Sequence, residues 1–398
     1  MLKAVVIITL VNSVLTAPSG VNFSPINEFS FNLLQNVFAY QENFGPQNLA
    51  VSPVSVWNIF SLLSGGASGA TFAELSQLLR LPKDVRVTQD LHLASNSVLK
   101  VKNKDVILNK QAAMFVEREL QIHPEFCESA SKYNTEIYTV DASNTTKLAN
   151  DINYFICMAT EGAIKDAVKP DLLENLRLLL VDAMYFKANW TTPFDSRQTK
   201  RETFYDQQGR SIGDVNMMYQ KAPNKIVYAA ELEADVLELT YGEDKEFAMV
   251  IFLPDYGVPL KRVLNNLSTK PTDAWTKLLQ NEEQMSSVEC QVPRFKISSQ
   301  LDLIQPLKYM GLYSIFDEMK AELPGISDSP LYVSKTIQKT ELEVTEEGTV
   351  AAVATVVGLE NRILGPSINV NKPFVYAIVN RRHNIVLFTG VYTNPSVV

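Results

Sequence analysis

The chain has 398 residues, of which 46% are hydrophobic and 20% are charged, and its formal net charge is −8. This much apolar surface offsets the entropy of ordering the chain, so disorder is excluded as the dominant state. Apart from the extreme N-terminus, no stretch approaches the roughly 20 apolar residues of a membrane-spanning helix. The acidic net charge, without a basic tail, argues against a nucleic-acid partner. We therefore expect a globular protein that binds neither membranes nor nucleic acids.

Cysteines and histidines are few. The three cysteines show no Cys-x-x-Cys spacing and cannot all pair with one another, which excludes a disulfide scaffold and argues against a zinc site. We expect small, mostly buried thiols, and the alternative is a free thiol that links two chains. The histidines lie in unrelated local contexts and are interpreted as scaffold residues, and no metal or cofactor is predicted. The residues concerned are Cys127, Cys157, Cys290, His92, His123 and His383.

Residues 1–19 are predicted to be a secretory signal peptide. Lys3 gives a positive start, residues 4–11 form a short and mostly apolar run, and small residues follow, with cleavage near Ser19 or Gly20. The alternative is a buried N-terminal strand. The signal peptide predicts a secreted, extracellular protein.

Asn-x-Ser/Thr sites occur at four positions. Asn144 and Asn266 lie in polar stretches and are the expected glycan carriers. Asn22 is weakened by the Pro25 that follows, and Asn189 lies in an apolar segment. Glycosylation at the first two sites would fit a secreted protein.

Helical signals dominate the first hundred residues. Ser24-Pro25 and Ser52-Pro53 each offer an N-cap residue followed by proline at the first helical position. Thr71 and Glu74 have the spacing of a capping box ahead of an apolar segment. Helices are therefore expected near residues 25, 53 and 72.

Strands alternate with helices further along the chain. The apolar runs 178–181 and 247–253 fit central strands that are buried on both faces. Residues 374–379 and 385–391 are predicted to be two strands around a polar turn. The fold class is therefore α+β, and no repeat or low-complexity linker supports a domain boundary.

Residues 340–373 form the most informative segment. Acidic residues precede Gly348, and residues 349–357 are small, β-branched and uncharged. Fully extended, residues 349–362 would span about 46 Å at roughly 3.3 Å per residue, far longer than a usual strand. Two interpretations are open: a long edge strand, or a loop that can become a strand.

This segment is the point at which the chain resembles a known family. Residues 346–349, Glu-Glu-Gly-Thr followed by small residues, resemble the hinge of the serpin reactive-centre loop. The serpin C-terminal signature is resembled by residues 371–374, 388–390 and 394–395, and the serpin shutter segment by residues 48–55. Further matches are residues 185–187, Trp190, 193–194, 236–239 and 252–254. The resemblance covers residues 22–395 in order.

The resemblance implies one domain over residues 20–398. Its expected architecture has three β-sheets, about nine helices and an exposed reactive-centre loop at about 346–370. In overall style the sequence resembles secreted arthropod serpins, and the usual state of the family is a monomer.

The resemblance also places the scissile bond of the loop. In serpins this bond follows the fourteenth residue after the hinge glycine, which here is Arg362. The spacing to the Asn-Lys-Pro-Phe element downstream agrees, so Arg362-Ile363 is the predicted bait bond. An arginine suits a trypsin-like serine protease, whose specificity pocket holds a carboxylate. Residues 361–365 also resemble the activation site of trypsin-like zymogens, which leads to the hypothesis that the target activates another protease in a cascade.

The mechanism that the resemblance implies is that of a suicide substrate and not of an enzyme. The target protease is acylated by Arg362, and the loop inserts into the main sheet, a well-known case of strand addition that releases stored strain. By register, the residues that face the core after insertion are Thr349, Ala351, Val353 and Thr355. Val350 replaces a usual acidic residue, and Val353 is bulkier than the usual alanine. The full hinge is Glu346, Glu347, Gly348, Thr349, Val350, Ala351, Ala352, Val353 and Ala354.

Two groups of residues are expected to control insertion, again by resemblance. The shutter group is Ser52, Ser55, Asp182 and Gln338, in which Asp182 replaces a usual asparagine and Gln338 replaces a frequent histidine. A buried, ionised Asp182 without donors would be costly, so it is predicted to accept hydrogen bonds from Gln338 or the Ser52 region. The breach group is Trp190, Arg294 and Glu346, in which Glu346 is expected to pair with Arg294.

Other functions are weighed against inhibition. A non-inhibitory serpin, acting as a cleavable substrate or a binding protein, is the main rival because Val350, Val353 and the altered shutter depart from the family pattern. A hydrolase is disfavoured because no histidine has a recognisable catalytic partner. A glycosaminoglycan site is a weaker hypothesis than a solvated turn, and its residues would be Lys100, Lys102, Lys104 and Lys110.

Overall fold

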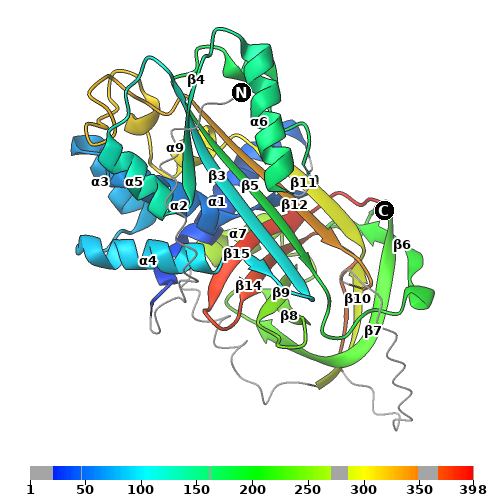
Figure 1. Cartoon of the computed structure of the whole chain (residues 1–398). Helices are drawn as coiled ribbons and strands as arrows, with labels where there is room; N and C mark the ends of the chain where they lie inside the picture. Colours follow the sequence, from blue (N-terminus) through cyan, green and yellow to red (C-terminus); the bar gives the residue numbers. More distant parts are fainter. Residues whose placement is uncertain are drawn as a thin grey trace.

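The computed structural model describes residues 21–45, 47–160, 162, 164–269, 286–347 and 366–397 (Figure 1). The predicted signal peptide lies outside these ranges. The α-helices in the described ranges are α1 (Ser24–Gln41), α2 (Pro53–Ser64), α3 (Gly69–Leu79), α4 (Val85–Ser97), α5 (Pro124–Lys132), α6 (Thr145–Ala159), α7 (Leu260–Thr269) and α9 (Ile304–Tyr309). Short 3-10 helices span Glu42–Phe44, Pro170–Leu173, Ser196–Gln198 and Ser314–Phe316.

One predicted helix start agrees with the structure and two differ. α2 begins at Pro53 after its N-cap Ser52, as predicted, whereas α1 begins one residue early, at Ser24, with Phe23 at the N-cap position. The capping box at Thr71 is wrong, because α3 already begins at Gly69 and Ser68 takes the N-cap position. Glu74 instead accepts hydrogen bonds from the backbone N–H groups of Tyr313 and Ser314, at 2.7 and 2.8 Å. A tertiary contact thus replaces the local one.

Among the described residues, the main sheet has six strands, and it carries the candidate site. Its order is β11-β12-β5-β3-β2, with β4 paired to β3. β12 pairs in parallel with β5, and β3 pairs antiparallel to β5. The strands are β2 (Val101–Lys102), β3 (Val106–Glu117), β4 (Thr135–Val140), β5 (Leu178–Ala188), β11 (Phe295–Leu301) and β12 (Lys335–Val344).

A second system of nine strands is two sheets that share β7. β7 pairs with β6 and β10 through residues 211–224 and with β8 through residues 225–229. The order is β1-β15-β14-β9-β8-β7-β10-β13, with β6 on β7. The strands are β1 (Leu49–Val51), β6 (Lys200–Tyr205), β7 (Ser211–Ala229), β8 (Ala234–Tyr241), β9 (Phe247–Pro254), β10 (Ser286–Pro293), β13 (Ser367–Asn369), β14 (Phe374–Asn380) and β15 (Ile385–Tyr392). Together with the main sheet, the described residues form three sheets, as predicted.

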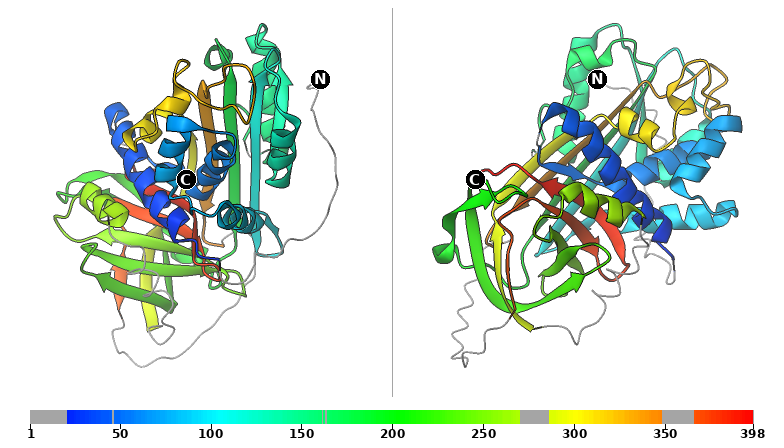
Figure 2. Two further views of the ribbon diagram at one scale, coloured as in Figure 1. Left: turned by 90° about the vertical axis from the view of Figure 1, so that its left-hand side faces the viewer. Right: turned by 180° about the vertical axis from the view of Figure 1, so that it is seen from behind.

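Helices cover both faces of the main sheet. Figure 2 shows α6 on one side of the sheet, and α1 and α2 on the other. The side chains under α6 form a small apolar core with β3 and β5, while the larger core lies between the main sheet, α2 and the second system of strands.

Gly390 is required where β15 meets β1, because a Cβ atom there would overlap the Leu49 carbonyl and the Tyr376 ring. The helices and sheets described above confirm the predicted α+β class.

The cysteines are free thiols, and Cys290 is buried, which raises its pKa to about 12. Within the described ranges, no three metal-binding side chains gather at one place. Among the helices described, none combines the length and apolar character needed to span a membrane.

Candidate functional site

The candidate site lies around the seam between β5 and β12. β12 ends at Val344, and the chain continues through Glu346 and Glu347 toward the predicted loop. It is described again from Pro366, where β13 pairs in parallel with β10 in another sheet. The predicted hinge residues Gly348, Thr349, Val350, Ala351, Ala352, Val353 and Ala354, and the bait bond Arg362-Ile363, lie outside the described residues. The structure therefore gives the two ends of the predicted loop and the seam beside it.

Gln338 and Asp182 occupy opposite positions across this seam. The parallel register runs from Lys335 opposite Leu179 to Leu342 opposite Phe186, and it places Gln338 opposite Asp182. Both side chains point to the inner face, where Gln338 is 1% exposed and Asp182 is 4% exposed. Any opening of the seam must separate this pair.

One amide joins the seam to the start of α2. Gln338 Nε2 donates to Asp182 Oδ2 at 2.7 Å and to the Ser52 carbonyl at 2.9 Å, and Gln338 Oε1 accepts from the Ser52 N–H at 2.9 Å. Ser52 Oγ donates to the Leu387 carbonyl of β15 at 2.9 Å. The hydrogen bond that the sequence predicts between Gln338 and Asp182 is present.

The environment of Asp182 disfavours its charge. Burial raises the pKa of Asp182, and the Lys110 ammonium, the Ser55 hydroxyl and the Gln338 amide act in the opposite direction. Neither Asp182 Oδ1 nor the buried Ser55 Oγ completes a hydrogen bond of acceptable geometry. The carboxylate therefore has one satisfied oxygen, whereas buried polar groups are usually fully paired.

Lys110 lies near Asp182. It does not lie with the surface lysines that are its neighbours in the sequence. Its Nζ donates to Asn96 Oδ1 of α4 at 2.9 Å. Removal of the ammonium from solvent lowers the pKa of Lys110 to about 8, although the nearby Asp182 charge partly counteracts this effect. The signal that could have found it is strand alternation, because Ala112, two residues further along β3, pairs with Asp182.

The breach residues meet where β12 ends. Arg294 Nη1 lies 3.5 Å from Glu346 Oε2, and Thr199 Oγ1 donates to Glu346 Oε1 at 2.8 Å. Trp190 Nε1 donates to the Thr345 carbonyl at 2.8 Å, and the Phe194 N–H donates to the Glu346 carbonyl at 2.8 Å. The predicted pair of Glu346 and Arg294 is present, and Thr199 is a partner that sequence reasoning missed.

The other three lysines lie on the surface around β2. Lys100, Lys102 and Lys104 are exposed, and Lys104 Nζ pairs with Glu243 at 2.7 Å. With Lys104 paired and Lys110 turned inward, the predicted group of four cations is not assembled as one patch.

The predicted glycan carriers differ in their surroundings. Asn144 is exposed at the N-cap of α6, where its side chain accepts from the Lys147 N–H at 3.0 Å. Asn266 is half-buried within α7, and its Nδ2 donates to Glu233 at 3.4 Å. Asn144 is thus the more accessible of the two.

Known proteins resemble the chain over nearly its whole length. The family model described as Serpin (serine protease inhibitor) matches residues 24–395. Human Serpin B8 is 33% identical over 365 residues, which cover 89% of this chain and 95% of that protein. Native protease nexin-1 with heparin has a TM-score of 0.78 at 27% identity, covering 94% of this chain and 100% of that one. Serpin-12 of Manduca sexta, with a TM-score of 0.79 at 24% identity over 92% of this chain and 98% of that one, shows likeness of fold alone.

The sequence predicts that the chain is not an enzyme, and this prediction is corrected by the family match. The matching family is described by the proteases that its members inhibit. Such a description does not by itself exclude a catalytic activity, so the exclusion is withdrawn.

The fold, the geometry of the seam and the sequence motifs all agree with this family match. The family match spans both the helical first part and the strand-rich last third. This chain belongs to the serpin family.

Proposed function

We propose that the chain is a secreted suicide-substrate inhibitor of a trypsin-like serine protease, with Arg362-Ile363 as its bait bond. The observation that carries the proposal is the closed, parallel seam between β5 and β12, whose second strand leads directly into the predicted loop.

Opening this seam offers a gain in backbone pairing. A strand that turned back after Glu347 and entered between β5 and β12 would run antiparallel to both. One parallel ladder would be replaced by two antiparallel ladders, which are slightly more stable per residue. Residues 349–359 carry no charge, so their burial would avoid the several kcal/mol that an unpaired charge costs. The intact chain would therefore hold free energy that a cut in the loop releases.

The covalent step follows ordinary acyl transfer. The serine Oγ of the target attacks the carbonyl carbon of Arg362 and loses its proton to the target's histidine. The C–N bond to Ile363 breaks, the Ile363 amine leaves with that proton, and Arg362 remains as an ester on the protease. Insertion of the freed loop carries the protease away and distorts it before water hydrolyses the ester.

Insertion would pass the breach first and the shutter second. Glu346 lies at the end of β12, where the loop would enter, and Gln338 lies halfway along the strand. The hydrogen bonds of these two residues would therefore break in sequence, and their strength would set the rate at which the seam opens.

Specificity would come from Arg362 and from the residues beside it. An arginine fits a specificity pocket with a carboxylate. Because residues 361–365 resemble a zymogen activation site, we infer that the target is a protease that activates others in a cascade. Complexes formed only with digestive trypsin, and never with an activating protease, would contradict this part.

Residues 1–19 support secretion, and the exposed Asn144 offers a glycan site. We further propose that the chain is similar to the secreted serpins of arthropods. A glycosaminoglycan partner has weaker support: protease nexin-1 is known with heparin, but Lys104 is paired here and Lys110 is turned inward.

A non-inhibitory role is the second candidate, favoured by one specific observation. The side-chain amide of Gln338 makes three hydrogen bonds, to Asp182 and to the backbone of Ser52, at the seam that the loop must enter, and insertion must separate Gln338 from Asp182. A seam that opens too slowly would let the target hydrolyse the ester, which makes the chain a substrate and not an inhibitor.

The test is to mix the mature protein with trypsin and to separate the products on a denaturing gel. A band near the sum of the two masses, together with a released peptide that begins at Ile363, is the expected result. The matched control is Arg362→Glu, which should give neither product. Cleavage at the same bond with no stable complex would move the assignment to the second candidate.

A further inference from the structure

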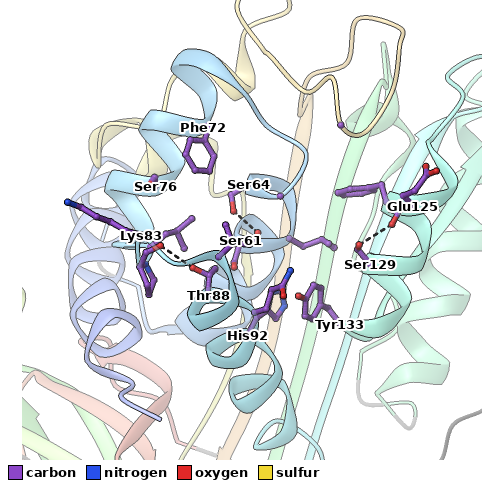
Figure 3. Close-up of a pocket in the computed structure, with 18 residues that line it drawn as sticks. Ser61, Ser64, Phe72, Ser76, Lys83, Thr88, His92, Glu125, Ser129 and Tyr133 are labelled. Atoms are coloured by element: carbon purple, nitrogen blue, oxygen red, sulfur yellow. Dashed lines mark hydrogen bonds between the residues drawn. The ribbon is translucent and has the colours of Figure 1, made fainter.

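A mostly apolar cavity lies among the helices that pack beside the main sheet. It has a volume of about 540 Å³ and lies between α2, α3, α4 and α5 (Figure 3). This size falls within the range of small-molecule sites, which are typically apolar clefts with a few convergent polar groups. Its apolar walls come from Leu62, Phe72, Leu81, Val85, Phe126 and Tyr133.

Two polar groups on the wall of this cavity lack partners. Ser61 Oγ and His92 Nε2 complete no hydrogen bond, although their residues are only 5% and 2% exposed. Figure 3 shows both side chains at the cavity, Ser61 on α2 and His92 on α4. Leaving a buried donor or acceptor unpaired is costly, and such groups in a cavity are what a ligand would satisfy.

The chemistry of His92 limits what this ligand can be. Burial, together with the nearby Lys110 charge, lowers the pKa of His92 well below its usual range. The ring is therefore neutral, with one nitrogen that donates and one that accepts. A hydroxyl group both donates and accepts, so it can serve His92 in either tautomer and Ser61 at the same time. An ionised group would lose its hydration in this apolar space, which is unfavourable.

The aromatic walls indicate the rest of the ligand. Tyr133 stacks on His92 with ring centroids 4.0 Å apart, and Phe126 and Phe72 line the same space. Phe72 and Val85 are also 45% and 67% exposed, so the mouth of the cavity is apolar. Aromatic rings pack well against such walls.

From the cavity, its two unpaired groups and its aromatic walls, we propose that this pocket binds an uncharged, hydroxylated aromatic molecule, with the hydroxyl group between Ser61 and His92. The site shares no lining residue with the seam, and binding there requires no protease.

The experiment uses 4-phenylphenol as the probe and biphenyl as its matched control, with binding to the full mature chain measured by titration calorimetry. The expected result is a 1:1 complex with 4-phenylphenol and weaker binding of biphenyl. Ser61→Ala should weaken the binding of 4-phenylphenol about fivefold to tenfold, which is the loss expected for one neutral hydrogen bond. The same variant should leave the affinity for biphenyl unchanged. Thr389→Val removes another buried hydroxyl without a partner, outside the pocket, and should change neither affinity.

A second variant tests the location. Ser76 lines the cavity from α3 and is half-buried, so Ser76→Trp should fill the space and abolish binding of both probes. No binding of 4-phenylphenol by the unmodified chain, or binding that Ser76→Trp leaves unchanged, would overturn the proposal. Because the readout is binding alone, its failure would leave the proposed inhibition intact, and loss of inhibition would leave this site intact.

Discussion

Gln338 Nε2 donates a 2.7 Å hydrogen bond to Asp182 Oδ2 directly across the seam between β12 and β5. The same amide nitrogen also donates to the Ser52 carbonyl. A single side chain thus holds both strands of the seam and the start of α2, and changes at either end of this bond should alter how readily the seam opens.

Asp182→Asn is expected to stabilise the closed seam. The asparagine oxygen keeps the hydrogen bond from Gln338, and its amide nitrogen can donate to Ser55 Oγ, which lacks a partner. The gain should be about 1 kcal/mol in the free energy of unfolding at pH 7. Urea unfolding measures it, and trypsin complex formation should become slower.

The pH dependence of the free energy of unfolding tests whether the buried charge of Asp182 causes this difference. Because the pKa of Asp182 is raised in the folded chain, the folded state binds more protons than the unfolded state above the ordinary value of 3.8. Stability therefore falls as the pH rises through this interval, and the cost persists at neutral pH. Asp182→Asn should remove that fall. Equal stability and inhibition in both proteins at every pH would mean that Asp182 has no part in the seam.

Lys110→Met should change stability above neutral pH. The pKa of Lys110 is about 8 in the folded chain and ordinarily 10.5, so between these values the unfolded state binds more protons. Stability then rises with pH across this window, by at most about 1.4 kcal/mol per pH unit. Unfolding at pH 7.5, 8.5 and 9.5 should show that the variant lacks this rise.

The control for this comparison is Lys102→Met on the neighbouring strand β2, where the lysine is exposed. It should keep the rise. His92 and Asp182 are the other titratable groups coupled to Lys110, and His92, whose pKa is lowered well below 6.5, is already neutral in this window. An unchanged pH profile in Lys110→Met would show that its ammonium is solvated.

Glu346→Ala should loosen the breach. Glu346 is 7% exposed and holds Thr199 and Arg294, so its removal leaves Arg294 unpaired and should cost about 1–2 kcal/mol. Glu347→Ala, at the exposed neighbouring position, should cost less than about 0.5 kcal/mol. Thermal unfolding of both variants makes the comparison, and equal losses would show that the contacts of Glu346 carry no stability.

Val353→Arg should convert the proposed inhibitor into a substrate. Val353 is predicted to face the core after insertion, where an unpaired charge costs several kcal/mol. Ala352→Arg would point outward and should preserve most of the complex. Counting the inhibitor molecules consumed for each trypsin inactivated separates these outcomes, and a similar count for both variants would contradict the predicted register.

The sequence predicts the elements whose signals are local and misses those decided by tertiary contact. Ser52-Pro53 starts α2 because proline fits the first helical turn, and the apolar run at 247–253 becomes the fully buried β9. The capping-box pattern at Thr71 misleads because Glu74 finds partners 239 and 240 residues away. The position of Lys110 misleads because grouping it with nearby lysines ignores strand alternation, which places Lys110 on the same face of β3 as Ala112, the residue that pairs with Asp182.

The candidate site also has a part that the sequence predicts and a part that it misses. Family motifs locate Gln338, Asp182, Glu346 and Arg294, and the hydrogen bond and ion pair expected among them are present. Thr199 could not be found from its neighbours in sequence, because it reaches Glu346 through a short 3-10 turn 147 residues away. The opening of the seam is a change between two states, which a pattern of residues in one state does not describe.

The placement of β14 and β15 decides what a proteolytic nick would leave behind. Both strands follow the predicted bait bond, yet they are interior members of their sheet, flanked by β9 and β1. A cut after Arg362 would thus divide the polypeptide without dividing the particle, because the downstream piece would still be hydrogen-bonded on both sides. The nicked protein should migrate as one species in gel filtration and separate into two pieces only in denaturant, so cleavage would pass unnoticed in any native assay of size.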